Sequence, residues 1–216
     1  MLHDILWRSN LHLAQSCLTH PFVQALGNGT LKADLFRAFI AQDAFFLRTF
    51  LKAYALALAR SDDSETIASF CELIGGVREE LKLHRIYAAE LGIDLESVVP
   101  NSACRAYTDF LLRLAWHTSL GETVAAMTPC MRLYAYLGGE LVLKCSQQHP
   151  YRRWIEAYSG AEFRRLAGRL EALLDRVGAD TREVRDSYRY ALQCELDFFS
   201  GARGTSAALF RERPQA

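Results

Sequence analysis

The chain has 216 residues, of which 50% are hydrophobic and 23% are charged, and it contains five prolines. It is therefore long and apolar enough to bury a large core, and its composition is not that of a disordered chain. Basic and acidic residues balance, so the formal net charge is zero. This balance excludes a strong electrostatic attraction to nucleic acid or to an anionic membrane surface, and it favours a small-molecule or protein partner.

No secretion signal or membrane anchor is predicted. The N-terminal segment MLHDILWRSNLHLAQ is amphipathic and lacks a basic region followed by an apolar stretch. No run approaches the roughly 20 apolar residues that are needed to span a bilayer. The six cysteines form no CxxC pair and lie mostly in apolar helical runs. A location in the reducing cytoplasm is the resulting expectation.

Apolar residues recur with helical spacing almost throughout, and convincing strand-type alternation is missing. The spacing predicts an all-α protein, with a single multi-helix domain over residues 1–201 and a loose tail over residues 202–216. The predicted helices cover residues 2–19, 31–60, 64–92, 102–118, 121–147, 160–177 and 181–201, with a short turn of helix at 151–158.

Polar and turn-forming residues mark the starts of several predicted helices. They lie at Gly27–Thr30, Ser61–Ser64, Pro100–Ser102 and Asp180–Glu183. In this interpretation Thr30 accepts a bond from an orphan backbone N–H group at the start of its helix. Asp180 and Glu183 are expected to form a variant of the capping box.

An acid interrupts the apolar stripe of the predicted helix 31–60. Asp43 falls at helical spacing among four phenylalanines and therefore occupies a core-facing position; these are Phe36, Phe39, Phe46 and Phe50. Burying an unpaired carboxylate is costly, so Asp43 must be paired, protonated or used by a ligand. A structural pair with a nearby Arg, Tyr or His is the competing interpretation.

The last predicted helix repeats this arrangement. Glu195 lies at helical spacing from Tyr188, Leu192 and Phe199, so it also interrupts an apolar face. The same two interpretations apply to it, a structural pair or a role toward a ligand.

A cysteine in the predicted helix 121–147 has an unusual setting. Cys130 directly follows Pro129, and Tyr134 lies one turn further on the same face. A proline inside a helix removes a backbone donor and perturbs the preceding turn, which can open the helix toward a cavity. The thiol would act as a nucleophile only as thiolate. Since Arg132 falls off this face, a buried acid or tyrosine would have to take the proton; an inert buried cysteine is the alternative.

Further polar and aromatic groups fall on inward faces. Tyr107, Tyr134 and Tyr158 fit either core packing or the walls of a pocket for a flat heteroaromatic ligand. Glu80 and His84 share one helix face and could be metal ligands. Di-iron bundles, however, use Glu-x-x-His spacing on two helices, and a structural hydrogen bond for His84 is favoured.

With these residues in place, the chain resembles the TenA-type thiaminase II family, the aminopyrimidine aminohydrolases of thiamin salvage. The resemblance covers about residues 3–200 and depends on the order and spacing of several short segments. These are HPFVQALGNGTL at 20–31, AQDAFFLRTF at 41–50, EELKLHRIYAAELGI at 79–93, TPCMRLYAYLG at 128–138, HPYRRWIEAYSGAEF at 149–163 and CELDFF at 194–199.

The resemblance implies a helical, haem-oxygenase-like fold, a tetrameric assembly and no metal or organic cofactor. It implies that Cys130 is the nucleophile, as in the cysteine-containing branch of the family. It also implies that Asp43 hydrogen-bonds the aminopyrimidine and that Glu195 is the acid and base near the leaving group. The matching pocket residues are Phe46, Tyr107, Tyr134 and Tyr158.

The implied reaction begins with addition of the cysteine thiolate to the electron-poor pyrimidine ring. The group on the 5-methylene carbon then leaves, water adds, and the thiol departs. The implied conversion is from 4-amino-5-aminomethyl-2-methylpyrimidine (aminomethylpyrimidine) to 4-amino-5-hydroxymethyl-2-methylpyrimidine (hydroxymethylpyrimidine), with thiamin as a poorer substrate. The sequence departs from the family at Phe46, a tyrosine in some members, and at Ala44 and Arg132, where larger or aromatic residues are common, so the leaving-group preference is left open.

Three other functions compete with this one. An oxidase related to pyrroloquinoline quinone synthase would line its pocket with histidine and arginine, yet only His84 lies on a segment placed near the pocket. A haem-oxygenase-like activity needs an axial histidine, for which the first helix offers only His12. A non-enzymatic protein that binds a thiamin-related ligand would bind tightly without turnover.

Overall fold

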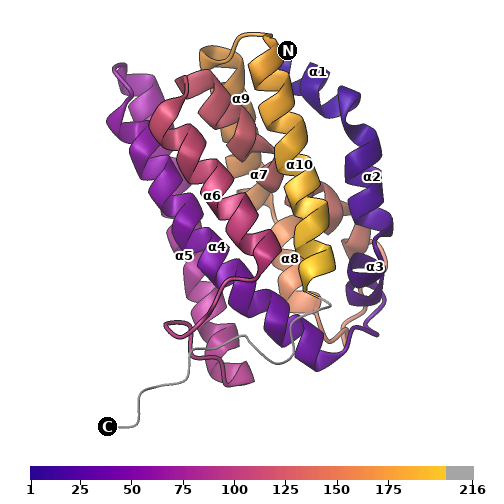
Figure 1. Ribbon diagram of the computed structural model, residues 1–216. Coiled ribbons are helices and arrows are strands. Elements are labelled where there is room, and N and C mark those ends of the chain that lie inside the picture. Colours follow the sequence, from indigo (N-terminus) through magenta and orange to yellow (C-terminus); the bar gives the residue numbers. More distant parts are fainter. Residues whose placement is uncertain (203–216) are drawn as a thin grey trace, which may run out of the picture.

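The computed structural model describes residues 1–202, and these residues form ten α-helices and no β-strand (Figure 1). The helical prediction is therefore confirmed. The helices are α1 (Leu2–Ser9), α2 (Leu11–Thr19), α3 (Pro21–Gly27), α4 (Ala33–Ala59), α5 (Ser64–Leu91), α6 (Ser102–His117), α7 (Leu120–Val142), α8 (Arg152–Ser159), α9 (Ala161–Val177) and α10 (Arg182–Gly201). Of the expected tail, residues 203–216 lie outside the described residues, and Ala202 is buried at the end of α10.

Helix α7 is the centre of the bundle, because α8, α9 and α10 all pack against it. Helix α4 lies between α5 and α6, and α5 also contacts α9. The short helices α1 and α2 lie on the side of the bundle away from α5, and α3 packs against α4 through Phe22 and Phe39 (Figure 1). This arrangement leaves α4, α5, α7, α8 and α9 around one interior space.

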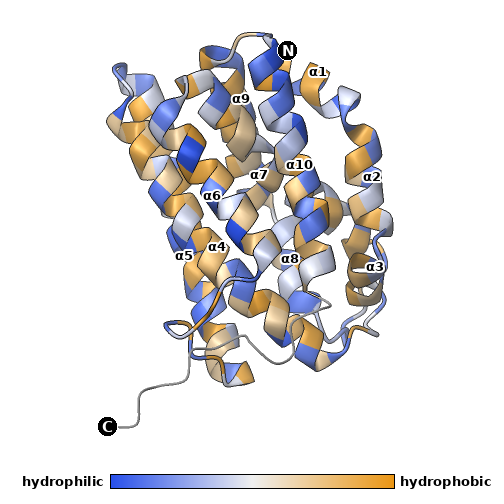
Figure 2. Cartoon of the chain, in the orientation of Figure 1, coloured by the Kyte–Doolittle hydropathy of each residue, from blue (hydrophilic) through white to orange (hydrophobic). Residues whose placement is uncertain are grey.

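The helices are amphipathic, with hydrophobic and hydrophilic residues alternating in patches along their surfaces (Figure 2). Helices α4 and α7 depart from this pattern because neighbours cover them on several sides, and most of their central residues are buried. Polar groups on these two helices therefore face protein rather than water. Among the described residues, no helix is long and apolar enough to cross a membrane.

The prediction of one continuous first helix over residues 2–19 was wrong, because the structure has two helices there, α1 and α2. The chain divides it at Asn10, whose side-chain Nδ2 donates a hydrogen bond to the Leu6 carbonyl at 2.8 Å and so competes with the helical ladder. Helix α3 was not predicted. It begins at Pro21, and the His20 ring accepts a hydrogen bond from the Phe22 N–H. Proline at the first helical position was the available signal.

The capping predictions were partly right. Asp63 accepts from the Thr66 N–H at 3.0 Å, and Asn101 accepts from the Cys104 N–H at 2.8 Å. The cap at Thr30 was wrong, because its N–H and hydroxyl both donate to the Asn28 side chain in the preceding turn. The cap at Asp180 was also wrong: Thr181 caps α10 instead.

Helix α7 ends at Val142, five residues before the predicted end at residue 147. Leu143 caused the error, since its apolar side chain extends the helical pattern in the sequence. In the structure Leu143 is 80% exposed, so it contributes nothing to the core that holds the helix.

Candidate active site

A cavity of about 490 Å³ lies among α4, α5, α7, α8 and α9. This volume suits a small-molecule ligand. The predicted site residues Asp43, Phe46, Cys130, Tyr134 and Tyr158 all line it. Tyr107 and Glu195 are not among the lining residues.

Charged side chains surround the mouth of the cavity. Arg165 pairs with Glu72 and Glu162, both at 2.9 Å, and these three side chains are 41% to 73% exposed. Asp43, by contrast, is 4% exposed at the inner end. The cavity therefore leads from a solvated ring of ion pairs to a buried acid.

Asp43 is held by a histidine from the neighbouring helix α5. His84 Nε2 lies 2.9 Å from Asp43 Oδ2, and His84 Nδ1 lies 3.0 Å from the Glu80 carbonyl oxygen. Both partners are acceptors, so both ring nitrogens can donate only when the imidazole carries two protons. The predicted structural hydrogen bond of His84 is confirmed. Among the described residues, no group of three His, Cys, Asp or Glu side chains is arranged to hold a metal ion.

The charge state of His84 follows from these contacts. Burial lowers the pKa of His84, but the hydrogen bond and charge of Asp43, together with Glu80, outweigh burial and raise that pKa to about 9. His84 is therefore cationic at neutral pH. It fixes Asp43 Oδ2, while Asp43 Oδ1 has no hydrogen-bond partner among the described residues and is free for a ligand.

Glu80 is a second acid in the cavity wall. The Tyr158 hydroxyl donates to Glu80 Oε1 at 2.5 Å. Burial, and then the charge of Asp43, raise the pKa of Glu80 to about 7 despite the opposing effects of His84 and Tyr158. From the sequence, Glu80 was a candidate only for metal ligation. Its spacing of four from His84 was the signal that it shares the inward face.

Cys130 faces the cavity from the interior of α7. Pro129 lies within the helix and has no N–H to offer the preceding turn, as predicted. Burial raises the pKa of the Cys130 thiol well above its usual value, and the nearby Glu195, Glu80 and Asp43 raise it further. The sulfur is therefore a thiol in the ligand-free site, and it needs a proton acceptor before it can attack.

Glu195 on α10 is the acid in contact with this thiol. Its carboxyl interacts directly with the Cys130 thiol, and the Tyr107 hydroxyl donates to Glu195 Oε1 at 2.9 Å. Burial raises the pKa of Glu195 to about 8, although the hydrogen bonds from Tyr107 and Cys130 lower it. At neutral pH most of the Glu195 carboxyl is therefore protonated, and its carboxylate form is a stronger base than an ordinary one. Glu195 and Tyr107 thus lie behind the thiol rather than in the cavity wall.

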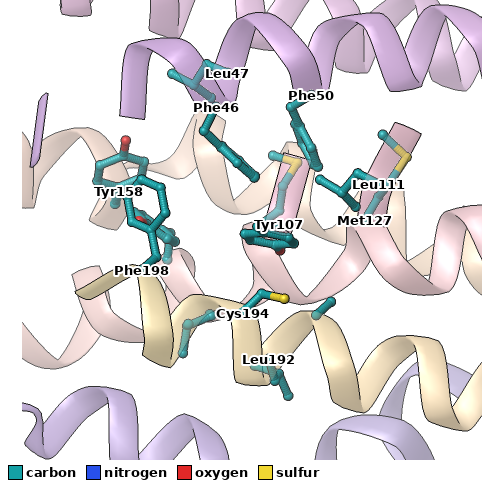
Figure 3. Close-up of a cluster of buried hydrophobic side chains, with 14 of the residues drawn as sticks. Phe46, Leu47, Phe50, Tyr107, Leu111, Met127, Tyr158, Leu192, Cys194 and Phe198 are labelled. Carbon is teal, nitrogen blue, oxygen red and sulfur yellow. The ribbon is translucent and has the colours of Figure 1, made fainter. Parts of the chain in front are cut away.

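Aromatic rings complete the walls. Tyr134 packs against Tyr158 with 4.9 Å between ring centroids, and Phe46 packs against Tyr107 at 4.8 Å. Figure 3 shows Phe46 and Phe50 of α4 directed toward Tyr107, with Cys194 of α10 on the other side of that ring. The rings leave a space with flat, apolar sides beside the acids.

The position of Tyr158 depends on a close approach between α7 and α8. A Cβ atom added to Gly138 would lie 2.6 Å from both the Tyr158 carbonyl carbon and the Ser159 nitrogen. Gly138→Ala is therefore expected to push α8 away and to lower the free energy of unfolding by about 1–3 kcal/mol. Chemical denaturation of the variant and of the unchanged protein measures the difference in unfolding free energy.

The matched control is Gly139→Ala, because a Cβ atom there meets no atom within 4 Å. Alanine in this helical position is expected to stabilise the fold by about 0.4–1 kcal/mol. Equal unfolding free energies for the two variants would contradict the role of Gly138.

The sequence model of the TENA/THI-4/PQQC family matches residues 7–204. The chain belongs to this family. Its TENA/THI-4/PQQC match spans all the helices that surround the cavity.

Similar curated members include two bacterial proteins named aminopyrimidine aminohydrolase. That of Halalkalibacterium halodurans is 36% identical over 162 residues, covering 72% of this chain and 72% of its own. That of Bacillus subtilis is 33% identical over 177 residues, covering 79% of this chain and 75% of its own. The mitochondrial bifunctional TH2 protein of Arabidopsis thaliana is 35% identical over 206 residues and 83% of this chain. The chain spans only 33% of that plant protein.

Solved structures of TenA proteins have the same fold. A TenA homologue from P. horikoshii has a TM-score of 0.87 at 28% identity, covering 95% of this chain and 100% of its own. A TenA family transcription regulator from Silicibacter sp. TM1040 has a TM-score of 0.87 at 24% identity, covering 94% of this chain and 96% of its own. The second likeness shows the fold alone.

Arg132 and Ala44, at which the sequence departs from the family pattern, do not line the cavity. Arg132 points away from the cavity, as predicted: it pairs with Glu171 at 3.3 Å and lies over the Trp7 ring. Ala44 is buried but does not line the cavity. His12 is exposed on α2, outside the lining residues, so it is not placed to ligate a haem there.

Proposed function

We propose that this chain is an aminopyrimidine aminohydrolase of thiamin salvage that converts aminomethylpyrimidine to hydroxymethylpyrimidine. One observation carries the proposal: the Cys130 thiol faces an aromatic-walled cavity that is also lined by Asp43, which His84 holds from outside the lining. The names of the bacterial relatives support the same reaction.

Asp43 and the aromatic rings would bind the pyrimidine. Oδ1 of Asp43 can accept a hydrogen bond from the 4-amino group of the pyrimidine, while the protonated His84 holds Oδ2 of Asp43. Phe46 and Tyr134 offer apolar faces to the flat ring. This orientation would bring the ring toward the sulfur of Cys130.

Glu195 would then take the thiol proton as the sulfur attacks. The thiolate electron pair forms a bond to an electron-poor ring carbon, and electrons pushed through the ring break the bond from the 5-methylene carbon to the leaving group. Water adds to the resulting exocyclic methylene. The carbon–sulfur pair returns to sulfur, and Glu195 gives the proton back. The leaving amine needs one further proton, and the water supplies one.

Product analysis by mass spectrometry tests this function. Incubation with aminomethylpyrimidine is expected to yield hydroxymethylpyrimidine and ammonia, with slower cleavage of thiamin. Binding of these compounds with no product would reject the enzyme in favour of a binding or regulatory protein. The quinone-type oxidase is disfavoured because the lining residues include no histidine, and their one arginine, Arg165, is paired at the mouth.

Asp43→Asn tests the recognition step. The amide keeps the shape but turns an acceptor-only group into a mixed donor and acceptor. Loss of a charge-assisted hydrogen bond worth about 1.5–3 kcal/mol should weaken binding of hydroxymethylpyrimidine by about 10-fold or more. Calorimetry measures the affinity, and Asp62→Asn, at an exposed position outside the cavity, is the control. Unchanged affinity of Asp43→Asn would remove Asp43 from recognition.

Two further proposals concern the whole protein. The resemblance supports a tetramer, which light scattering of the purified chain tests. A cytoplasmic location is in keeping with the bacterial relatives, although the plant relative is a mitochondrial protein.

A further inference from the structure

The cavity is larger than one pyrimidine ring requires. Its volume of about 490 Å³ lies within the range of roughly 300–1,000 Å³ that is typical of sites for drug-sized ligands, whereas aminomethylpyrimidine is a single six-membered ring with small substituents. The proposed place of that ring is the inner end, beside Asp43 and Cys130. Most of the other lining residues belong to α5 and α9, and the space between these two helices is here called the outer chamber.

Two neighbouring glycines on α5 shape the outer chamber in different ways. A Cβ atom added to Gly76 would collide with the Leu166 side chain, so Gly76 lets α9 pack closely against α5. A Cβ atom added to Gly75 would meet no atom within 4 Å, although Gly75 lines the cavity. Glycine inside a helix costs about 0.5–1 kcal/mol relative to alanine. At Gly75 the helix therefore gives up stability and leaves room that a ligand can occupy.

An aromatic ring bounds the outer chamber on the α9 side. Phe163 lines the cavity and lies edge-on to Tyr158, with 4.9 Å between ring centroids and 88° between ring planes. It directly follows Glu162, whose side chain is 73% exposed at the mouth. Phe163 is therefore the next ring outward from Tyr158 of the inner wall. A second flat ring joined to the pyrimidine can pack against it.

The walls of the cavity present mainly carboxyl groups to an occupant. Among the described lining residues Arg165 is the one base, and there are five acids, Asp43, Glu72, Glu79, Glu80 and Glu162. Two of the cations that pair with these acids lie outside the lining: Lys82 is 2.7 Å from Glu79, and Arg169 is 3.7 Å from Glu72. A cation in the outer chamber is therefore attracted, and a phosphate group is repelled.

We propose that the outer chamber is a subsite for a flat, cationic heteroaromatic leaving group that carries no phosphate. Phe163 is the stacking face of this subsite, and Gly75 provides its room. The assignment rests on the proposed function, in which thiamin, the poorer substrate, carries such a group. Its thiazolium ring is joined to the pyrimidine through the 5-methylene carbon. Thiamin is therefore bound whole, and its phosphate esters are excluded.

The subsite contributes to binding more than to bond cleavage. When the bond from the 5-methylene carbon to the thiazolium nitrogen breaks, its electron pair goes to the nitrogen, and the ring leaves as a neutral thiazole. The attraction of the ring to Phe163 and to the carboxyl groups is therefore strongest before cleavage. Such attraction lowers KM without raising kcat. The loss of charge also helps the thiazole to leave through the acidic mouth.

Calorimetry on the Cys130→Ser protein tests the subsite, because this variant is expected to bind ligands without consuming them. The three ligands are hydroxymethylpyrimidine, which fills only the inner end, thiamin and thiamin monophosphate. We expect thiamin to bind more tightly than hydroxymethylpyrimidine and at least about 10-fold more tightly than thiamin monophosphate. Thiamin and its monophosphate binding equally would overturn the proposal, and so would thiamin binding no more tightly than hydroxymethylpyrimidine.

Phe163→Leu, made in the same protein, tests the stacking face. Leucine keeps an apolar side chain but offers no aromatic ring to a cation, so thiamin should bind about threefold more weakly or worse. Hydroxymethylpyrimidine should change by less than about twofold, because it does not reach the outer chamber. Phe163→Tyr keeps the ring and is expected to bind thiamin normally. Equal losses of both ligands in Phe163→Leu would mean that Phe163 only supports Tyr158, and the proposal would be overturned.

Gly75→Leu tests the room in the outer chamber. The added side chain is expected to occupy the space of the thiazolium ring and to weaken thiamin binding by about 10-fold or more, with little effect on hydroxymethylpyrimidine. The matched control is Gly168→Leu on α9, because a Cβ atom there also meets no atom within 4 Å and Gly168 does not line the cavity. Normal binding of thiamin by Gly75→Leu would place the thiazolium ring elsewhere.

Turnover by the unchanged protein separates this proposal from the proposed function. Product formation from aminomethylpyrimidine, without the expected differences in thiamin binding, would overturn the subsite and leave the function intact. No product from aminomethylpyrimidine or thiamin, with those binding differences present, would reject the function while supporting the subsite as a binding site.

Discussion

Cys130→Ser is expected to keep the fold and to lose at least about two orders of magnitude in turnover of aminomethylpyrimidine, because a serine hydroxyl is a far poorer nucleophile than a thiolate. The substitution replaces one small side chain by another at a position that already faces the cavity. Calorimetry with hydroxymethylpyrimidine should therefore show that binding persists. Product formation followed by mass spectrometry gives the rate.

The control for this substitution is Cys71→Ser, since Cys71 is an exposed thiol on α5. It should retain full activity. A Cys130→Ser variant with a near-normal rate would remove the nucleophile from the mechanism and direct attention to the carboxyls alone.

Glu195→Gln is expected to have the second large effect, a loss of about 100-fold or more in turnover. The amide keeps the volume and can still accept the Tyr107 hydrogen bond, but it cannot take the proton of the Cys130 thiol. Both substrates should slow, and the loss should be larger for aminomethylpyrimidine than for thiamin, because the departing amine needs a proton and the thiazole does not. Equal losses for the two substrates would argue against Glu195 as the acid for the leaving group.

The stability of the same variant has a defined pH dependence. Burial raises the pKa of Glu195 to about 8, above the ordinary value of 4.5, so the folded state binds this proton more tightly than the unfolded state. The stability that this proton contributes is complete below the ordinary pKa and is lost as the pH rises through about 8. Glu195→Gln should therefore lose less thermal stability than the unchanged protein as the pH rises from about 4.5 to about 8. A larger loss would make Glu195 a structural residue.

The spacing of apolar residues was enough to predict which faces of the helices point inward. Asp43 and Cys130 both interrupt apolar stripes, and both line the cavity. Spacing could not predict which inward faces meet. Asp43 and His84 are 41 positions apart, and Glu80 and Tyr158 are 78 apart. Their contacts depend on how α4, α5 and α8 pack, and that is a property of the whole bundle.

The errors at helix ends have a different origin. Asn10 divides the first helix through a single side-chain hydrogen bond to a backbone carbonyl. Leu143 extends the apolar pattern of α7 without being buried. Each effect is local and changes the free energy only slightly, so the helical spacing of apolar residues alone does not predict it.

The raised pKa of the Cys130 thiol has a consequence for the chemical durability of the protein. Peroxides, disulfides and alkylating agents react with thiolate far faster than with thiol. The Cys130 thiol, kept protonated by its surroundings, is therefore shielded from these reagents, and in the proposed mechanism it becomes reactive only when Glu195 takes its proton with a pyrimidine bound. The exposed Cys71 lacks this protection, so oxidative damage should begin there and spare the reactive centre.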